Sequence, residues 1–134
     1  MKVCVIGDSG LLGQALVQAI AGMETGEVLG ISTSPFGPTS FWRKPAGQYQ
    51  HEVCNLLHQW EWFLSLMETF QPDLVINCVA LTNLSECEKN PVLSGRVNSE
   101  LPGRLAEWAR QEKTSFIHIS TDQVFDGKKG SPYL

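Results

Sequence analysis

The sequence lacks several features that would point to particular classes of protein. It has no Cys-x-x-Cys pair, never more than two basic residues in a row, and no long uninterrupted apolar segment. Its four cysteines and three histidines are scattered without the spacing of metal ligands, so we expect reduced thiols and no bound metal. A net charge of −4 without a basic cluster argues against a nucleic-acid partner and against a polybasic membrane anchor.

Membrane and export signals are absent from the sequence as well. The longest apolar run, residues 74–81, is interrupted by Asn77 and is far shorter than the ~20 residues that a membrane span needs. Only four apolar residues separate Lys2 from Gly7, which does not match a secretory signal. We therefore expect a cytoplasmic protein with no membrane partner. A length of 134 residues suits a single domain, residues 1–134.

Apolar periodicity predicts strands that alternate with helices. Short apolar or β-branched runs predict strands at 2–6, 27–33, 50–54, 73–79 and 115–120. Apolar spacing of three to four residues predicts helices at 11–20 and 60–70, and a further helix from about 90. We expect this last helix to break near 98–102 and to resume through 101–109, because Pro102 is tolerated only in a first helical turn. Residues 34–49 and 122–134 are predicted loops.

This alternation predicts an α/β fold. Strands joined by helices form right-handed βαβ units, and such units build a parallel sheet. We expect a Rossmann-like, doubly wound sheet in three αβα layers, ending after its fifth strand. In such a fold the ligand binds at the carboxyl ends of the strands.

A glycine-rich turn follows the first predicted strand. Residues 7–13 read GDSGLLG, a G-x-x-G-x-x-G pattern. In this context Gly7 permits a tight turn, Gly10 lets the backbone approach a pyrophosphate, and Gly13 lets the helix pack close to the sheet. The helix start offers free N–H groups to phosphate oxygens. Since a strand precedes the turn and an amphipathic helix follows it, we predict a dinucleotide site that includes Ser9 of the turn.

The end of the second strand bears on which dinucleotide binds. Counting 20 residues from Gly13 reaches Thr33, and no Asp or Glu stands in this ISTS segment. The carboxylate that would hold a ribose diol is missing, which leaves room for a 2′-phosphate and favours NADP(H) over NAD(H). Arg43 and Lys44 in the next loop could reach that phosphate, or they could be a solvated surface pair.

Polar residues also follow the fourth and fifth predicted strands. The segments are NCVALT at 77–82 and ISTDQVFDG at 119–127. In a parallel sheet both face the same crevice as the glycine turn, and a hydroxyl there can bind a substrate carbonyl. Residues 120–122 could equally be an ordinary turn with an Asp cap.

The glycine turn, the 77–80 segment, Asn98 and above all the STDQVFDG stretch resemble the extended short-chain dehydrogenase/reductase family. Within that family the chain is most similar to the dTDP-4-dehydrorhamnose reductases, which reduce the C4 ketone of a nucleotide-linked 4-keto-6-deoxy sugar. The resemblance implies a nucleotide-sugar substrate and leaves a homodimer open. It also implies roles for individual residues. Gly10, Leu11 and Leu12 would lie at the pyrophosphate, Asn55 and Leu56 at the adenine, and Val79, Ala80 and Leu81 at the nicotinamide-side ribose. Asn98 and Ser120 would belong to cofactor-binding motifs, Thr121 would be the catalytic hydroxyl, and Asp122 would lie near the substrate.

The chain departs from this family at several positions. Cys78 and Val79 replace two alanines, and Gln123 replaces an aromatic residue. The family's Tyr-x-x-x-Lys, in which Tyr is the general acid, occurs nowhere in the sequence. Two interpretations remain open. The chain is the nucleotide-binding portion of a longer reductase and is inactive alone, or it is a non-catalytic regulatory subunit similar to the methionine adenosyltransferase β subunit.

Overall fold

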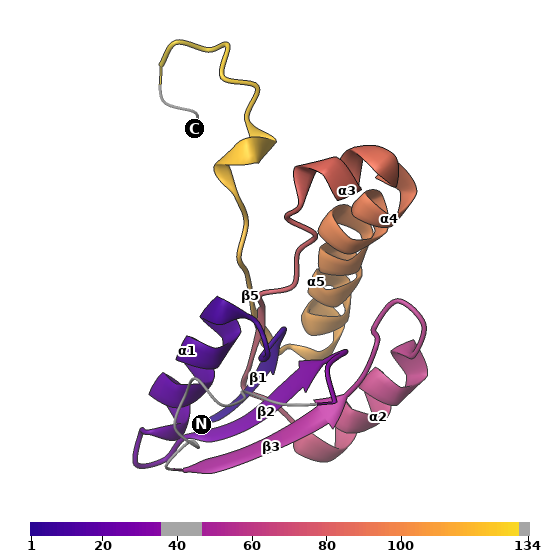
Figure 1. The fold of residues 1–134 in the computed structure, drawn as a ribbon. Helices are drawn as coiled ribbons and strands as arrows, with labels where there is room; N and C mark the ends of the chain where they lie inside the picture. The colour runs from indigo at the N-terminus through magenta and orange to yellow at the C-terminus, as the bar shows by residue number, and fades with distance from the viewer. Residues whose placement is uncertain (36–46, 132–134) are drawn as a thin grey trace.

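A computed structural model describes residues 1–35 and 47–131. The chain alternates between strands and helices (Figure 1). The strands are β1 (Lys2–Ile6), β2 (Glu27–Ser32), β3 (Gln48–Val53), β4 (Leu74–Asn77) and β5 (Ser115–His118). The helices are α1 (Leu11–Ala21), α2 (Trp60–Phe70), α3 (Leu84–Lys89), α4 (Pro91–Gly95) and α5 (Leu101–Glu112), with a π-helical turn at Arg96–Glu100 and a 3-10 turn at Asp122–Val124.

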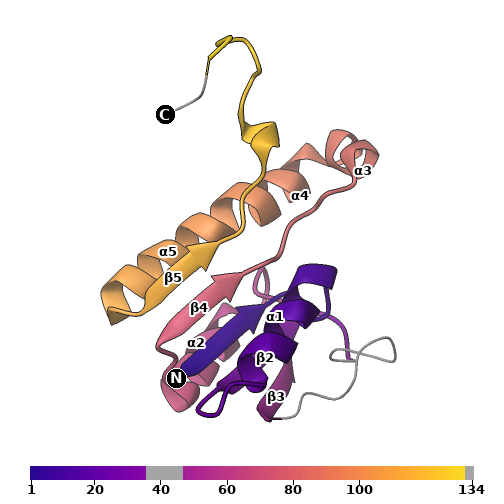
Figure 2. The ribbon, with the colours of Figure 1, turned by 90° about the vertical axis from the view of Figure 1, so that its left-hand side faces the viewer.

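The five strands form one parallel sheet in the order β3-β2-β1-β4-β5. The chain adds β2 and β3 on one side of β1 and then crosses back to add β4 and β5 on the other side. The strand order therefore reverses between β1 and β4. Beyond β4 and β5 the chain continues at the carboxyl edge of the sheet, where α3 and α4 lie (Figure 2). A parallel sheet whose order reverses in this way places its ligand site at the reversal point.

Helices cover the sheet on two sides, with α1 on one face and α2 and α5 on the other (Figure 1). Alternate residues of β1 supply the two cores: Val3 and Val5 belong to the cluster that contains Val17 of α1. Cys4 and Ile6 belong to the cluster of the opposite face, which packs against α2 and α5. Because side chains of a strand alternate between faces, this pattern requires a helix layer on each side. The predicted three-layer Rossmann-like fold is confirmed.

The local predictions hold in part. Strand β3 starts at Gln48, so residues 48 and 49 are not loop, and α3 was not predicted. The α-helix resumes at Leu101 with Pro102 in its first turn, as expected, but the predicted break is a π-helical turn and not an end of the helix: the N–H of Leu101 donates to the carbonyl of Arg96. A proline ring clashes with the carbonyl four residues earlier, and a wider π turn relieves that clash at Pro102.

Within residues 1–35 and 47–131 there is no helix with the length and apolar character to cross a membrane.

Candidate functional site

A cavity of about 400 Å³ opens at the carboxyl ends of β1, β2 and β4. This is the point where the strand order reverses, and the volume lies within the roughly 300–1,000 Å³ of ordinary ligand pockets. No charged side chain of the described residues lines it. The lining residues are Ile6, Gly7, Ser9, Gly10, Ile31, Ser32, Thr33, Cys54, Asn55, Leu56, Leu57, Cys78, Val79, Ala80, Leu93, Val97 and Leu101.

The glycine turn forms one wall of the cavity, and glycine suits each of its three positions for a different physical reason. Gly7 has a φ of +86°, and its N–H donates to the carbonyl of Ile31 at 2.7 Å. A Cβ on Gly13 would overlap the carbonyl oxygen of Gly7 and lie 2.8 Å from Asp8 Cα, so this glycine is needed for helix α1 to pack. Gly10 is exposed, and a Cβ there meets only the Gly7 carbonyl, at 3.3 Å. Of the three, Gly10 is therefore the one whose bare backbone faces outward at the start of α1.

The ends of β2 and β3 form the opposite wall. Ser32 and Thr33 line the cavity at the end of β2, and the N–H of Cys54 donates to the Ser32 carbonyl at 2.9 Å. The Asn55 side chain accepts from the N–H of Leu57 at 3.1 Å and so orders the turn that leads into α2. Three predicted cofactor residues of this wall, Thr33, Asn55 and Leu56, thus line the same cavity as the predicted Gly7, Ser9 and Gly10 of the glycine turn. Arg43 and Lys44 lie outside the described residues.

The segment after β4 is held by two asparagines. Asn77 is fully buried, and its side-chain oxygen accepts from the N–H of Val79 at 3.1 Å. Asn98, in the π-helical turn, makes a reciprocal pair with Leu81: its oxygen accepts from the Leu81 N–H at 2.8 Å, and its amide donates to the Leu81 carbonyl at 3.0 Å. These contacts fix Val79 and Ala80 against the cavity. Leu81 and Asn98, although predicted as cofactor residues, support this wall and do not line it.

The structure does not bring every predicted residue to the cavity. Ser120, Thr121 and Asp122 are exposed beyond β5 and do not line it, and the Thr121 hydroxyl donates to the Asp122 carboxylate at 3.2 Å. Leu11 and Leu12 are exposed in the first turn of α1, at 81% and 44%. Their side chains face away from the core, so only their backbone N–H groups are available for the role that the resemblance implies.

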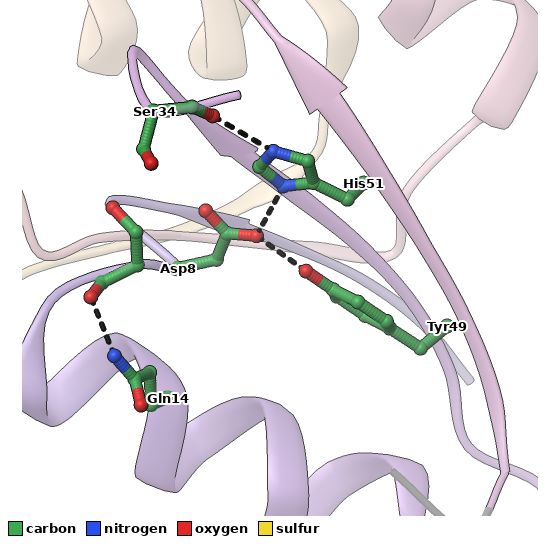
Figure 3. Close-up of polar contacts among 6 residues, drawn as sticks. Asp8, Gln14, Ser34, Tyr49 and His51 are labelled. Carbon is green, nitrogen blue, oxygen red and sulfur yellow. Dashed lines mark hydrogen bonds and ion pairs between the residues drawn. The ribbon is translucent and has the colours of Figure 1, made fainter. Parts of the chain in front are cut away.

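Three residues near the cavity were missed by sequence reasoning. Figure 3 shows the carboxylate of Asp8 between the side chains of Tyr49 and His51. Asp8 Oδ2 accepts from the Tyr49 hydroxyl at 2.6 Å and lies 2.7 Å from His51 Nδ1. We call Asp8, Tyr49 and His51 the Asp8 cluster. Tyr49 and His51 are two residues apart on β3 and therefore share a face, which is the signal in the sequence that could have revealed them.

Burial raises the pKa values of three side chains at or near the cavity. Burial, followed by the hydrogen bond to Asp8 and its charge, raises the pKa of the Tyr49 phenol above its ordinary value of 10. Burial likewise raises the pKa values of the Cys54 and Cys78 thiols that line the cavity. Because the thiolate is the nucleophile, these two cysteines are unsuited to nucleophilic chemistry.

We expect the Tyr49→Phe variant to differ from the wild type in its stability at alkaline pH. The raised pKa of Tyr49 favours the protonated phenol in the folded state, so its contribution to stability is complete below about pH 10 and is lost as the pH rises further. The variant loses about 1–2 kcal/mol at pH 7 with the hydrogen bond to Asp8. Denaturant unfolding from pH 7 to 11 checks this: the difference between the two proteins shrinks above pH 10, whereas a constant difference contradicts it.

The order of the parallel strands and the position of the cavity define a Rossmann-like α/β protein. The sequence pattern of the RmlD substrate binding domain matches residues 1–134, and the chain belongs to this family.

Three similar proteins show how far the likeness extends. A probable low-salt glycan biosynthesis reductase of Haloferax volcanii is 35% identical over 99% of the chain. A dTDP-4-dehydrorhamnose reductase of Aggregatibacter actinomycetemcomitans is 26% identical over 98% of it. The crystal structure of a hypothetical dTDP-4-dehydrorhamnose reductase from Sulfolobus tokodaii superposes with a TM-score of 0.77 at 26% identity over 99% of it. The chain spans 41%, 38% and 44% of these three proteins, so each has a large part with no counterpart here.

Proposed function

We propose that this chain is the NAD(P)-binding portion of an oxidoreductase that reduces the C4 ketone of a nucleotide-linked 4-keto-6-deoxy sugar. One observation carries the proposal. The cavity lies where the strand order reverses, and its wall is the glycine turn at the start of α1. The names of the similar proteins, which include reductases of a dTDP-linked sugar, support the substrate class.

The residues around the cavity fit a dinucleotide. The first turn of α1 has N–H groups without intrahelical partners, and the positive end of the helix dipole favours phosphate. Gly10 has no side chain to keep a pyrophosphate away from these groups. Apolar side chains such as Leu56, Val97 and Leu101 line the cavity and offer a surface suited to an adenine ring.

NADP(H) is proposed in preference to NAD(H). Thr33 stands at the end of β2, and no Asp or Glu of the described residues lines the cavity. A carboxylate there would bind the ribose diol and repel a 2′-phosphate. The exposed side chain of Thr33 instead offers a neutral hydroxyl, which can donate a hydrogen bond to a phosphate oxygen.

Thr121 and Asp122 are proposed to act on the sugar. A bound nicotinamide supplies the hydride, and the exposed hydroxyl of Thr121 would orient the C4 carbonyl that receives it. The alkoxide that forms also needs a proton, and general acid catalysis typically contributes about 10²–10⁴-fold. Because this sequence has no Tyr-x-x-x-Lys, we expect the 134 residues alone not to turn over a sugar nucleotide.

Calorimetric titration of the 134-residue chain with NADPH and NADH tests the proposal. We expect saturable binding of both dinucleotides with tighter binding of NADPH, and no oxidation of NADPH when a dTDP-4-keto-6-deoxy sugar is added. If neither dinucleotide binds at millimolar concentration, the proposed function is wrong. Tighter binding of NADH overturns the preference for NADP(H) alone. Steady turnover by this chain shows that Thr121 and Asp122 work by another mechanism.

A further inference from the structure

The Asp8 cluster is a buried charged group that the proposed function does not use. Asp8 is fully buried on the α1 side of the sheet, and its carboxylate passes over Gly30 of β2. A Cβ on Gly30 would lie 2.7 Å from Asp8 Cγ, so the glycine leaves the space that the carboxylate fills. Charged groups are rarely buried unless they are paired, so the arrangement calls for a reason beyond packing.

Both ring nitrogens of His51 lie within hydrogen-bond distance of an oxygen atom. Nδ1 lies 2.7 Å from Asp8 Oδ2, and Nε2 lies 3.0 Å from the carbonyl oxygen of Ser34. The same Asp8 oxygen accepts from the Tyr49 hydroxyl at 2.6 Å. The imidazole ring therefore contacts two segments that are far apart in the sequence.

His51 thereby joins the two walls of the cavity. Asp8 stands between Gly7 and Ser9, which line the cavity in the glycine turn. Ser34 directly follows Ser32 and Thr33, which line it at the end of β2. The side chain of His51 is 15% exposed and bridges the two segments from β3, as Figure 3 shows.

We infer that His51 is a positioning residue that fixes the 32–34 segment relative to the glycine turn, and so sets the affinity for the adenosine end of the dinucleotide. The inference rests on the proposed dinucleotide site. It assigns no contact between His51 and the ligand. Its effect is to hold Ser32 and Thr33 at a fixed distance from the phosphate-binding backbone, so that less ordering is required when the ligand binds.

Two variants separate this role from a purely structural one. His51→Asn keeps a donor near the position of Nδ1 for Asp8 but cannot reach Ser34. Tyr49→Phe removes a hydrogen bond to the same Asp8 oxygen and leaves the Ser34 contact in place. We expect His51→Asn to weaken NADPH and NADH binding about tenfold, and Tyr49→Phe to change it less than about twofold although it lowers stability. If His51→Asn does not fold, the double variant Asp8→Asn/His51→Asn removes the unpaired charge and takes its place.

Nuclear magnetic resonance of the ligand-free protein provides the second readout. We expect the amide signals of residues 32–34 to shift in His51→Asn but not in Tyr49→Phe. Equal binding by wild type and His51→Asn, or equal losses in the two single variants, would overturn the inference. If the wild type binds neither dinucleotide, the proposed function fails, and the amide shifts alone then decide whether His51 couples the two segments.

Discussion

The Gly13→Ala variant is expected to lose a large part of its stability, although the substitution adds only one methyl group. The new Cβ would overlap the carbonyl oxygen of Gly7 and stand 2.8 Å from Asp8 Cα. Both neighbours are backbone atoms of a turn that is fixed by the bond from the Gly7 N–H to the Ile31 carbonyl. Helix α1 must therefore move away from the sheet, which opens the core around Val17. Overpacking of this kind costs about 3 kcal/mol or more, a large part of a typical 5–15 kcal/mol.

Gly103→Ala is the matched control for this prediction. Gly103 is exposed in α5, and a Cβ there meets nothing within 4 Å. Because alanine is the better helix former, we expect this variant to be more stable than the wild type by about 0.5–1 kcal/mol. Urea unfolding of the two variants measures the contrast. A Gly13→Ala protein that is as stable as the wild type would show that the close approach of α1 to the glycine turn is not required for folding.

The fold was predictable because its signals are local and repeated. Five apolar runs, most of them separated by helical periodicity, specify βαβ units, and the handedness of these units leaves few arrangements of the sheet. The near-continuous apolar stretches of β1 and β4 also indicate strands buried on both faces, as the central positions of the sheet require. The glycine pattern also predicts where the site lies, because the turn that it forms connects β1 to α1 and therefore stands at the carboxyl end of β1.

The parts that were missed depend on contacts between distant segments. The π-helical turn accommodates Pro102 within a helix that sequence rules would end, and Asn98 ties that turn to Leu81 across 17 residues of chain. The Asp8 cluster needs Asp8 and His51 to meet across 43 residues, which only the pairing of β3 with β2 brings about. No rule of local spacing shows that an aspartate in a glycine turn has a histidine beside it.

The exposed ends of strands were the least predictable part of the site. Thr121 and Asp122 follow β5 as expected, yet neither lines the cavity that Thr33, Asn55 and Val79 share. A strand end fixes the edge of the sheet at which a residue lies, whereas the direction of the following chain depends on what packs against it. The dinucleotide part of the site is therefore better defined by this sequence than the part proposed to act on the sugar.

A Gly10→Val variant is expected to fold and to lose dinucleotide binding. Gly10 has φ −76° and ψ 165°, an extended conformation that valine adopts without strain. A Cβ at this position contacts only the Gly7 carbonyl, at 3.3 Å, so the remaining atoms of the side chain occupy the space in front of the first turn of α1. That is the space in which we propose that the pyrophosphate lies. Displacing the phosphates by about the width of a methyl group is expected to weaken binding on the order of 100-fold.

Gly103→Val controls for the change from glycine to valine itself. It introduces the same side chain at an exposed helical position, where nothing lies within 4 Å of the new Cβ. Calorimetric titration with NADPH, together with urea unfolding, separates the two effects: both variants are expected to unfold near the wild-type midpoint, and only Gly10→Val is expected to lose affinity. Wild-type affinity in a folded Gly10→Val protein would show that the phosphates do not approach this turn. The cavity would then bind its ligand through the β2 and β4 walls, where the Ser32, Thr33 and Val79 backbones are the remaining candidates.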